Sequence, residues 1–107
     1  MSTITMKYSG KNYTLEYTRQ SVKMMESQGF AAEELTKQPV TMIPLLFQGA
    51  FMKNHKGLKR ALIDEIYDNV SDKSALISAL VEMYSETVTA LIGDSDEEGK
   101  ASWAVAK

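Results

Sequence analysis

Acidic residues at helical spacing are the side chains of this sequence that could most readily do chemistry. Asp64, Glu65 and Asp68 fall within five positions, and Glu82 and Glu86 lie four residues apart. Carboxylates at such spacing can hold a hard cation or act as general acid and base. The solvated face of an ordinary helix carries the same pattern, and this commoner interpretation is preferred.

Other chemistry-bearing residues are scarce. The 107 residues include no cysteine, and His55 is the only histidine, so disulfides, thiolate ligands and paired-histidine zinc sites are excluded. No phosphate-binding loop, dinucleotide-binding glycine motif or nucleophile elbow occurs. We therefore expect no enzyme activity, no catalytic residue, no metal site and no cofactor.

The strongest basic cluster is the stretch KNHKGLKR at residues 53–60. Short Lys/Arg-rich stretches can contact phosphates, but cations also stabilise the carbonyl end of a preceding helix. No aromatic residues are interleaved here and the net charge is −2, which disfavours nucleic-acid binding. Residues 1–60 hold nine Lys and Arg against four acidic residues, and residues 61–107 hold three against ten. These opposite signs either steer association or neutralise each other within the fold.

Residues 3–18 are expected to form a β-hairpin, because apolar and polar residues alternate on both sides of a turn at residues 9–12. Gly10 and Asn12 are the turn residues that tolerate positive φ. A lone hairpin is marginal in water, so this one must lie on helices or recruit another strand.

A helix is expected next at residues 19–28, capped by Thr18 and ended by Gly29, with Phe30 folding back onto its apolar side. Residues 31–37 are expected to form a short helix that Pro39 closes.

The stretch VTMIPLLFQGAFMKNHKG, residues 40–57, is apolar nearly all round and is expected to form the central core helix. Thr41 is the expected N-cap, Pro44 is placed in the first turn, and Gly57 is the expected stop. Gly49 suggests a close approach by another backbone. The apolar run is too short for a membrane span, which needs roughly 20 residues.

Two amphipathic helices are expected to follow, at residues 58–70 and 74–92, the second with Ser71 as N-cap and Gly93 as stop. The sequence thus predicts one α+β domain at residues 1–93, with an N-terminal hairpin and four to five helices around the central one. Residues 94–107 are expected to be an acidic, mobile tail, in which Trp103 either docks or folds back.

The seven methionines allow two interpretations. Four of them lie in or near the central helices, at Met24, Met25, Met42 and Met52. Methionine fills cores, and it is also over-used at adaptable binding surfaces. Core filling is the commoner role, and a groove for a partner segment is the alternative.

Three stretches occur in order between about Lys7 and Trp103: YTLEYTRQSVKMMESQGF, VTMIPLLFQGAFMKNHKG and LIDEIYDNVSDKSALISALVEMYSETVTALIG. In this order the chain resembles the small tail-assembly proteins of tailed phages and prophages of Gram-positive bacteria. The most specific pieces are packing and capping residues: Met25-Glu26 with Gly29-Phe30, Leu46-Phe47-x-Gly49-Ala50-Phe51 with His55-Lys56, and Met83-Tyr84.

The resemblance implies a tail assembly chaperone, which coats the helical, aggregation-prone tape measure protein and helps tail tube subunits polymerise around it. The implied partners are the tape measure protein and, secondarily, the tail tube protein, with self-association as a further option and neither nucleic acid nor membrane. The implied location is the bacterial host cytoplasm and not the mature virion. The residues expected to contact a partner are apolar or aromatic: Met24, Phe30, Phe47, Phe51 and Met52, with Tyr8, Tyr13 and Tyr17 if the hairpin pairs between subunits.

The alternative is a small DNA-binding regulator, because the last two helices and their short connection have the order of a helix-turn-helix. A recognition helix should present Arg, Lys, Asn or Gln to base edges. Residues 74–92 carry two glutamates and no basic residue, which disfavours this alternative.

Overall fold

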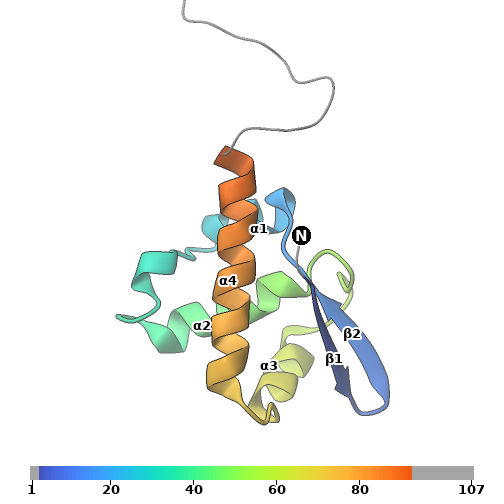
Figure 1. Ribbon diagram of the computed structural model, residues 1–107. Helices are drawn as coiled ribbons and strands as arrows, with labels where there is room; N and C mark the ends of the chain where they lie inside the picture. Colours follow the sequence, from blue (N-terminus) through green and yellow to red (C-terminus); the bar gives the residue numbers. More distant parts are fainter. Residues whose placement is uncertain (1–2, 93–107) are drawn as a thin grey trace, which may run out of the picture.

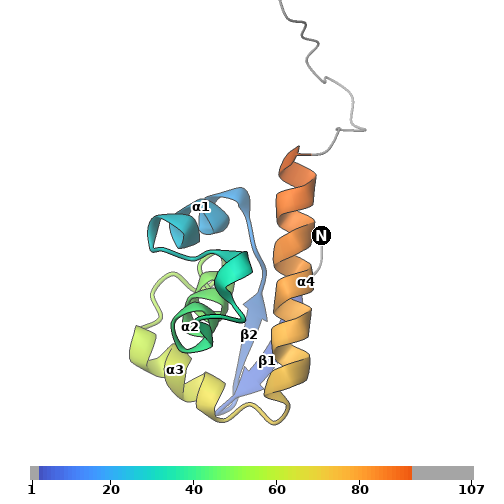
Figure 2. The same ribbon diagram turned by 90° about the vertical axis from the view of Figure 1, so that its left-hand side faces the viewer.

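The computed structural model describes residues 3–92, as a two-stranded antiparallel hairpin followed by four helices. The order is β1 (Ile4–Tyr8), β2 (Lys11–Leu15), α1 (Arg19–Ser27), the short 3₁₀ element η1 (Ala32–Glu34), α2 (Pro39–Ala50), α3 (Arg60–Asp68) and α4 (Lys73–Ile92). Helix α4 stands along one side, with α1, α2 and α3 stacked beside it (Figures 1 and 2). The predicted α+β class is confirmed, whereas the predicted tail at residues 94–107, with Trp103, lies outside the described residues.

The hairpin turns through two residues with positive φ, Ser9 at 50° and Gly10 at 78°. This combination is the tight turn whose twist matches the flanking strands. Asn12, predicted as a turn residue, instead lies in β2 opposite Lys7. The resulting register places Met6 opposite Tyr13, so that the alternating apolar residues share one face.

Helix α1 has the predicted ends. The Thr18 hydroxyl accepts a hydrogen bond from the Ser21 amide (3.0 Å), and the Ser21 hydroxyl in turn accepts from the Thr18 amide (2.8 Å). Gly29 has a φ of 97°, and the amide of Phe30 reaches back to the carbonyl of Met25 (3.0 Å). Phe30 therefore folds back into the core, where it is 4% exposed.

Helix α2 is shorter than predicted and starts earlier. It begins at Pro39 with Gln38 as N-cap, not at Thr41, because proline suits the first helical position, where its missing N–H needs no partner. Pro44 consequently lies inside the helix rather than in its first turn. The helix ends at Ala50, whose carbonyl accepts a hydrogen bond from the backbone amide of Glu16 (3.0 Å).

Residues 51–59 form a looped connection, which here is named the 51–59 loop. The basic cluster thus lies on this loop and the start of α3 instead of in a last helical turn. The short helix predicted at residues 31–37 is reduced to η1.

The last two helices are confirmed, with changed boundaries. Asp72, and not Ser71, caps α4, since its Oδ1 accepts the amide of Ala75 (3.1 Å). The predicted apolar stripe of α4 extends further than its packing, because Leu91 and Ile92 are 51% and 79% exposed.

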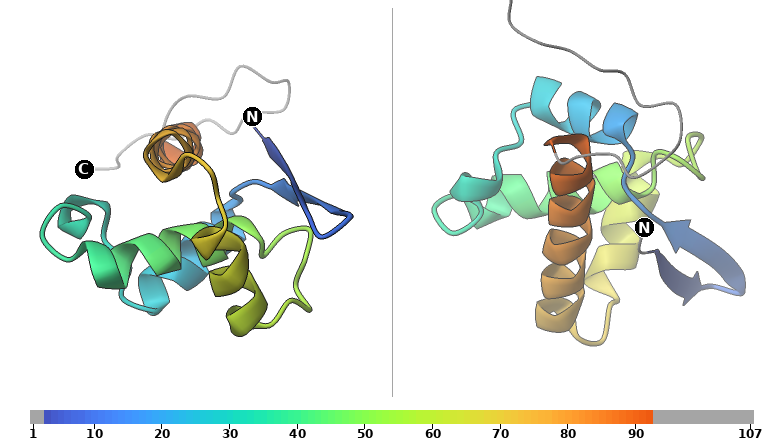
Figure 3. Two further views of the ribbon diagram at one scale, coloured as in Figure 1. Left: turned by 90° about the horizontal axis from the view of Figure 1, so that it is seen from below. Right: turned by 45° about the horizontal axis from the view of Figure 1, so that its top comes forward.

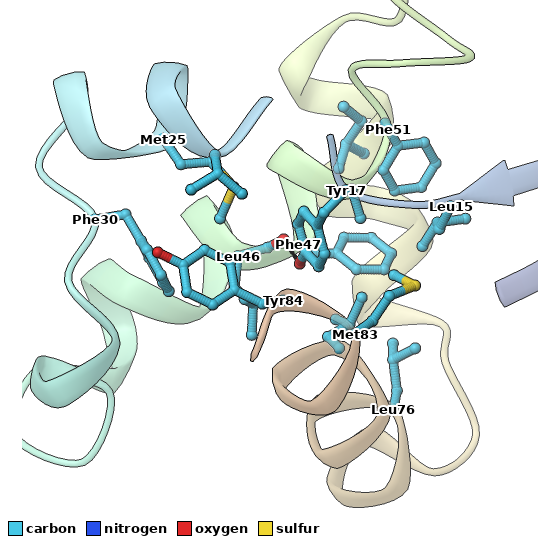
Figure 4. Packing of buried hydrophobic residues seen from close by; sticks show 14 of the residues in the cluster. Leu15, Tyr17, Met25, Phe30, Leu46, Phe47, Phe51, Leu76, Met83 and Tyr84 are labelled. Atoms are coloured by element: carbon cyan, nitrogen blue, oxygen red, sulfur yellow. Dashed lines mark hydrogen bonds between the residues drawn. The ribbon is translucent and has the colours of Figure 1, made fainter. Parts of the chain in front are cut away.

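The core gathers residues from every long element (Figure 4). Tyr17 lies at its centre and donates a hydrogen bond to the backbone carbonyl of Leu46 (2.5 Å). Burial raises the pKa of Tyr17, so this hydroxyl stays protonated as a donor. The predicted close approach at Gly49 is made by the side chain of Met25, not by backbone: a Cβ at Gly49 would lie 2.3 Å from its sulfur.

By length and composition α4 would pass as a membrane span, with a mean hydropathy of 1.4 over 18 residues. The core helix of a soluble protein meets the same criterion, and Leu80 and Met83 of α4 are buried in this core.

Candidate functional site

The eight residues predicted to contact a partner divide into two groups. Five are core residues with at most 5% exposure: Tyr13, Tyr17, Phe30, Phe47 and Phe51. The other three are reachable from solvent, with Met24 at 42% exposure and with Tyr8 and Met52 half-buried. The expected contact surface must therefore be redrawn around partly exposed residues. Of the buried rings, Phe47 and Phe51 line the two pockets described below, whereas Tyr13, Tyr17 and Phe30 line neither.

The hairpin tyrosines are occupied by contacts within the chain. Tyr13 packs edge-on against Phe51 and His55, with ring centroids 5.9 and 5.2 Å apart. The Tyr8 hydroxyl donates to the Glu65 carboxylate (2.7 Å), and this hydrogen bond raises the pKa of Tyr8. The hairpin is thus fastened to α3.

Helices α2 and α3 lie together on one side of α4 (Figure 3). The α2 residues at positions 40, 43, 44 and 47 recur at helical spacing and so share one face. With Asp64, Tyr67 and Asp68 of α3 they line a pocket of about 380 Å³, which here is named the acidic pocket. Its floor is apolar, from Ile43, Pro44 and the buried ring of Phe47.

A second pocket, of about 420 Å³, lies where α1, the 51–59 loop and the start of α3 meet, and here is named the basic pocket. Its apolar lining comes from Met24, Phe51, Met52, Leu58 and Ile63. Its charged lining residues are Lys56 and Arg60, and no carboxylate lines it. Three of the eight predicted residues, Met24, Phe51 and Met52, therefore meet in one place.

The two pockets are neighbours along the contact between α2 and α3. Gln48 lines the basic pocket and donates a hydrogen bond to Asp64 of the acidic pocket (3.4 Å). Positions 40, 43, 44, 47, 48, 51 and 52 form one stripe along α2 and its end, and positions 60, 63, 64, 67 and 68 form one along α3. The two pockets and the Gln48–Asp64 bond between them are here named the seam.

The 51–59 loop is fixed by polar contacts to β2 and to Glu16, the residue that follows it. The amide of Asn54 donates to the carbonyl of Thr14 (3.2 Å) and to the carboxylate of Glu16 (3.0 Å). Lys53 forms an ion pair with Glu16 (3.1 Å), and these two donors, Asn54 before Lys53, lower the pKa of Glu16. His55 Nε2 accepts the amide of Thr14 (3.0 Å), which requires an unprotonated Nε2.

Lys56 and Arg60, unlike Lys53, form no ion pair among the described residues. Both are exposed, and within residues 3–92 neither has a carboxylate within 4.0 Å. The 51–59 loop and the start of α3 thus each place one cation without a carboxylate partner among the described residues at the rim of an apolar pocket, where the two can meet an anionic partner.

The carboxylates of Asp64, Glu65 and Asp68, considered above as a cation or acid–base site, do not gather at one place. Glu65 turns to Tyr8, whereas Asp64 and Asp68 line the acidic pocket. No group of three or more His, Asp or Glu side chains among the described residues is placed to hold a metal ion.

The acidic pocket was missed by the sequence interpretation. The sequence signal for this pocket was an apolar residue, Val40, at the start of α2. In the structure Val40 is 87% exposed. The stripe at positions 40, 43, 44 and 47 was read as part of an all-round apolar core helix, although only one side of α2 faces the core.

Helix α4, which would be the recognition helix of a helix-turn-helix, presents no side chain that favours DNA binding. Lys73, the only basic residue of α4, donates to the carbonyls of Asp68 and Val70 (3.3 Å each). Its ammonium lies 5.6 Å from the centre of the Tyr67 ring. No cation is left on α4 for the phosphate backbone.

Comparison with known proteins places the chain in a family without naming an activity. No curated protein and no solved structure matches the sequence. One family model matches residues 1–106, nearly the whole chain. The protein therefore belongs to the family described as a domain of unknown function, DUF5055.

Proposed function

We propose that this protein binds an amphipathic helix of a partner protein along the seam, and that it acts as a tail assembly chaperone for the tape measure protein. The observation that carries the proposal is the pair of apolar pockets along α2 and α3, each with charged residues at its rim. Helix-in-groove binding uses such a surface to receive apolar residues spaced three to four apart.

The charges at the two ends of the seam define the partner further. Asp68 lies at one end, in the acidic pocket, and Lys56 and Arg60 lie at the other, in the basic pocket. The positive N-terminal end of a helix is favoured near carboxylates and its negative C-terminal end near cations. The bound helix is therefore expected to run parallel to α2, with its N-terminal end at Asp68.

The length of the seam suits a short, weakly bound segment. Helix α2 has 12 residues and is about 18 Å long, which corresponds to about three turns of a partner helix. Adaptable methionines at Met24 and Met52 suit a series of similar segments rather than one fixed sequence. A long helical client could engage many copies, and repeated weak contacts then add up to stable coating.

The resemblance to tail-assembly proteins supplies the identity of the client. A chaperone for the tape measure protein needs an apolar surface that tolerates many helical segments, and the apolar lining of the two pockets supports this proposal. Its action in the host cytoplasm, before the virion is complete, belongs to the same proposal, as does help to the tail tube protein.

The test is co-expression with the long helical protein encoded nearest downstream, measuring how much of this client stays soluble and co-purifies. Met24→Glu and Met52→Glu place a charge in the basic pocket at accessible positions and should abolish client recovery. Ser78→Glu, on the exposed side of α4, is the matched control and should preserve it. Equal recovery with all three variants, each shown to be folded by circular dichroism, would refute binding at the seam.

A further inference from the structure

We propose that two copies of this chain pair through the free edge of β1, so that their hairpins form one continuous antiparallel sheet about a two-fold axis. The pairing needs no client protein and does not depend on the proposed function. Only its consequence, a dimer that offers two seams to one long client, rests on that function.

The edge of the hairpin formed by β2 is already covered. In a hairpin with a two-residue turn, the pair next to the turn exchanges both backbone hydrogen bonds, and exchanging and non-exchanging pairs then alternate. Counted from the turn, Thr5 and Thr14 form a non-exchanging pair, so Thr14 points its amide and carbonyl away from β1. The 51–59 loop satisfies both groups, through His55 (3.0 Å) and Asn54 (3.2 Å).

The outer edge of β1 is open, by contrast. The same alternation points the amides and carbonyls of Thr5 and Lys7 away from β2. Within residues 3–92 these backbone groups have no hydrogen-bond partner on that side, and both side chains are exposed. The hairpin stands at one side of the molecule (Figure 1). A free strand edge is a template for a further strand, and a sheet of only two strands is marginal by itself.

The sequence of β1 complements itself about Met6. When two β1 strands run antiparallel about a two-fold axis at Met6, Thr5 of one copy faces Lys7 of the other, and this pair exchanges both backbone hydrogen bonds. Ile4 then faces Tyr8, and Met6 faces Met6 of the second copy. Apolar residues therefore meet apolar residues on one face of the sheet along the whole of β1, and polar residues meet on the other face.

This register also avoids a conflict of charge. A lysine on an edge strand commonly discourages pairing with another chain, but here Lys7 lies opposite a threonine. Shifting the strands by one step in one direction places Lys7 opposite Lys7, and like charges directly opposite are destabilising. A shift in the other direction leaves Tyr8 opposite no residue of the second β1. A second copy in the register centred on Met6 therefore fits the free edge best.

Disulfide cross-linking tests the register in the full chain without any client. The sequence has no cysteine, so a single introduced cysteine reports on one pair of positions. Met6 faces itself in a non-hydrogen-bonded pair, whose Cα atoms lie about 4.5 Å apart, within the range of a disulfide. Met6→Cys should therefore form a covalent dimer under mild oxidation. Thr5→Cys, at a more exposed position that faces Lys7, is the matched control and should form far less.

Proline substitution tests the edge itself. Thr5→Pro removes an amide that points outward, and an edge strand tolerates proline at such a position. Sedimentation over a series of concentrations should show association of the unmodified protein and single chains for Thr5→Pro. Asn12→Pro removes an outward amide at the opposite edge of the hairpin and should associate as the unmodified protein does.

Single chains of the unmodified protein at every concentration would overturn the proposal, as would equal cross-linking of Met6→Cys and Thr5→Cys. Association of folded Thr5→Pro equal to that of the unmodified protein would place the interface elsewhere and overturn it too. Since no client is present in these experiments, their failure leaves client recovery by co-expression as a separate test of the proposed function.

Discussion

Replacing Gly49 by alanine tests the packing of the Met25 side chain of α1 against the backbone of α2 at this glycine. In an open helix this change adds stability, up to about 1 kcal/mol, because alanine is the better helix former. Here the new Cβ would lie 2.3 Å from Sδ and 2.6 Å from Cγ of Met25, which is itself only 1% exposed. Overpacking of a core typically costs about 1–3 kcal/mol. The two effects together predict a net loss of about 1 kcal/mol.

The measurement is thermal or urea unfolding, in which 1 kcal/mol corresponds to a fall in Tm of roughly 4–8 °C for a domain of this size. Gly57→Ala is the control, because a Cβ there meets nothing within 4 Å and the residue has no positive φ. It should be neutral or slightly stabilising.

The double variant Gly49→Ala with Met25→Ala isolates the contact. Met25→Ala alone should cost about 2–5 kcal/mol through the cavity that it leaves. Once the Met25 side chain is removed, the methyl group introduced at position 49 has room, so the double variant should lose less than the sum of the two single losses. A gain of about 1 kcal/mol for Gly49→Ala alone, or strict additivity in the double variant, would refute the reasoning.

Three further changes test the contacts that hold the fold together. Tyr17→Phe removes the donor to the buried Leu46 carbonyl and should cost about 1–3 kcal/mol in urea unfolding; a neutral result would mean that this carbonyl finds another partner. Gly29→Ala forces a side chain onto a φ of 97° and should cost about 1–2 kcal/mol in the same assay, whereas no loss would show that α1 can end differently. Glu16→Gln should destabilise at pH 7, and the difference should shrink as the pH falls below the ordinary pKa of 4.5, since a lowered pKa contributes stability only while the carboxylate is charged. A difference that does not depend on pH would contradict this role of Glu16, and stability measured from pH 7 to pH 3 decides it.

The sequence predicted elements best where local chemistry acts alone. Thr18, Gly29 and Phe30 define both ends of α1 through contacts within a few residues, so their pattern was sufficient. The boundaries of α2 were wrong, because Pro39 suits the start of a helix as well as the end of one. Its C-terminal end depends on Glu16, a residue more than 30 positions earlier in the chain. The backbone amide of Glu16 donates a hydrogen bond to the carbonyl of Ala50.

The candidate site, like the fold, was predictable from the sequence only in part. The residue types of the basic pocket were recognisable, and Met24, Met52 and the cations at Lys56 and Arg60 were all singled out. Phe30 and the hairpin tyrosines were grouped with them because an aromatic residue at a groove and one in a core have the same type and spacing.

The sequence by itself determined the α+β class, both ends of α1 and the absence of cysteine and of a second histidine. Only the tertiary structure decided which side of α2 is covered, since burial depends on residues that are distant in the chain. It also decided that the opposite charges of the two halves of the chain meet in one seam, with Asp68 at one end and Lys56 and Arg60 at the other. Local propensities act within a few residues, whereas a pocket exists only once separate elements have packed together.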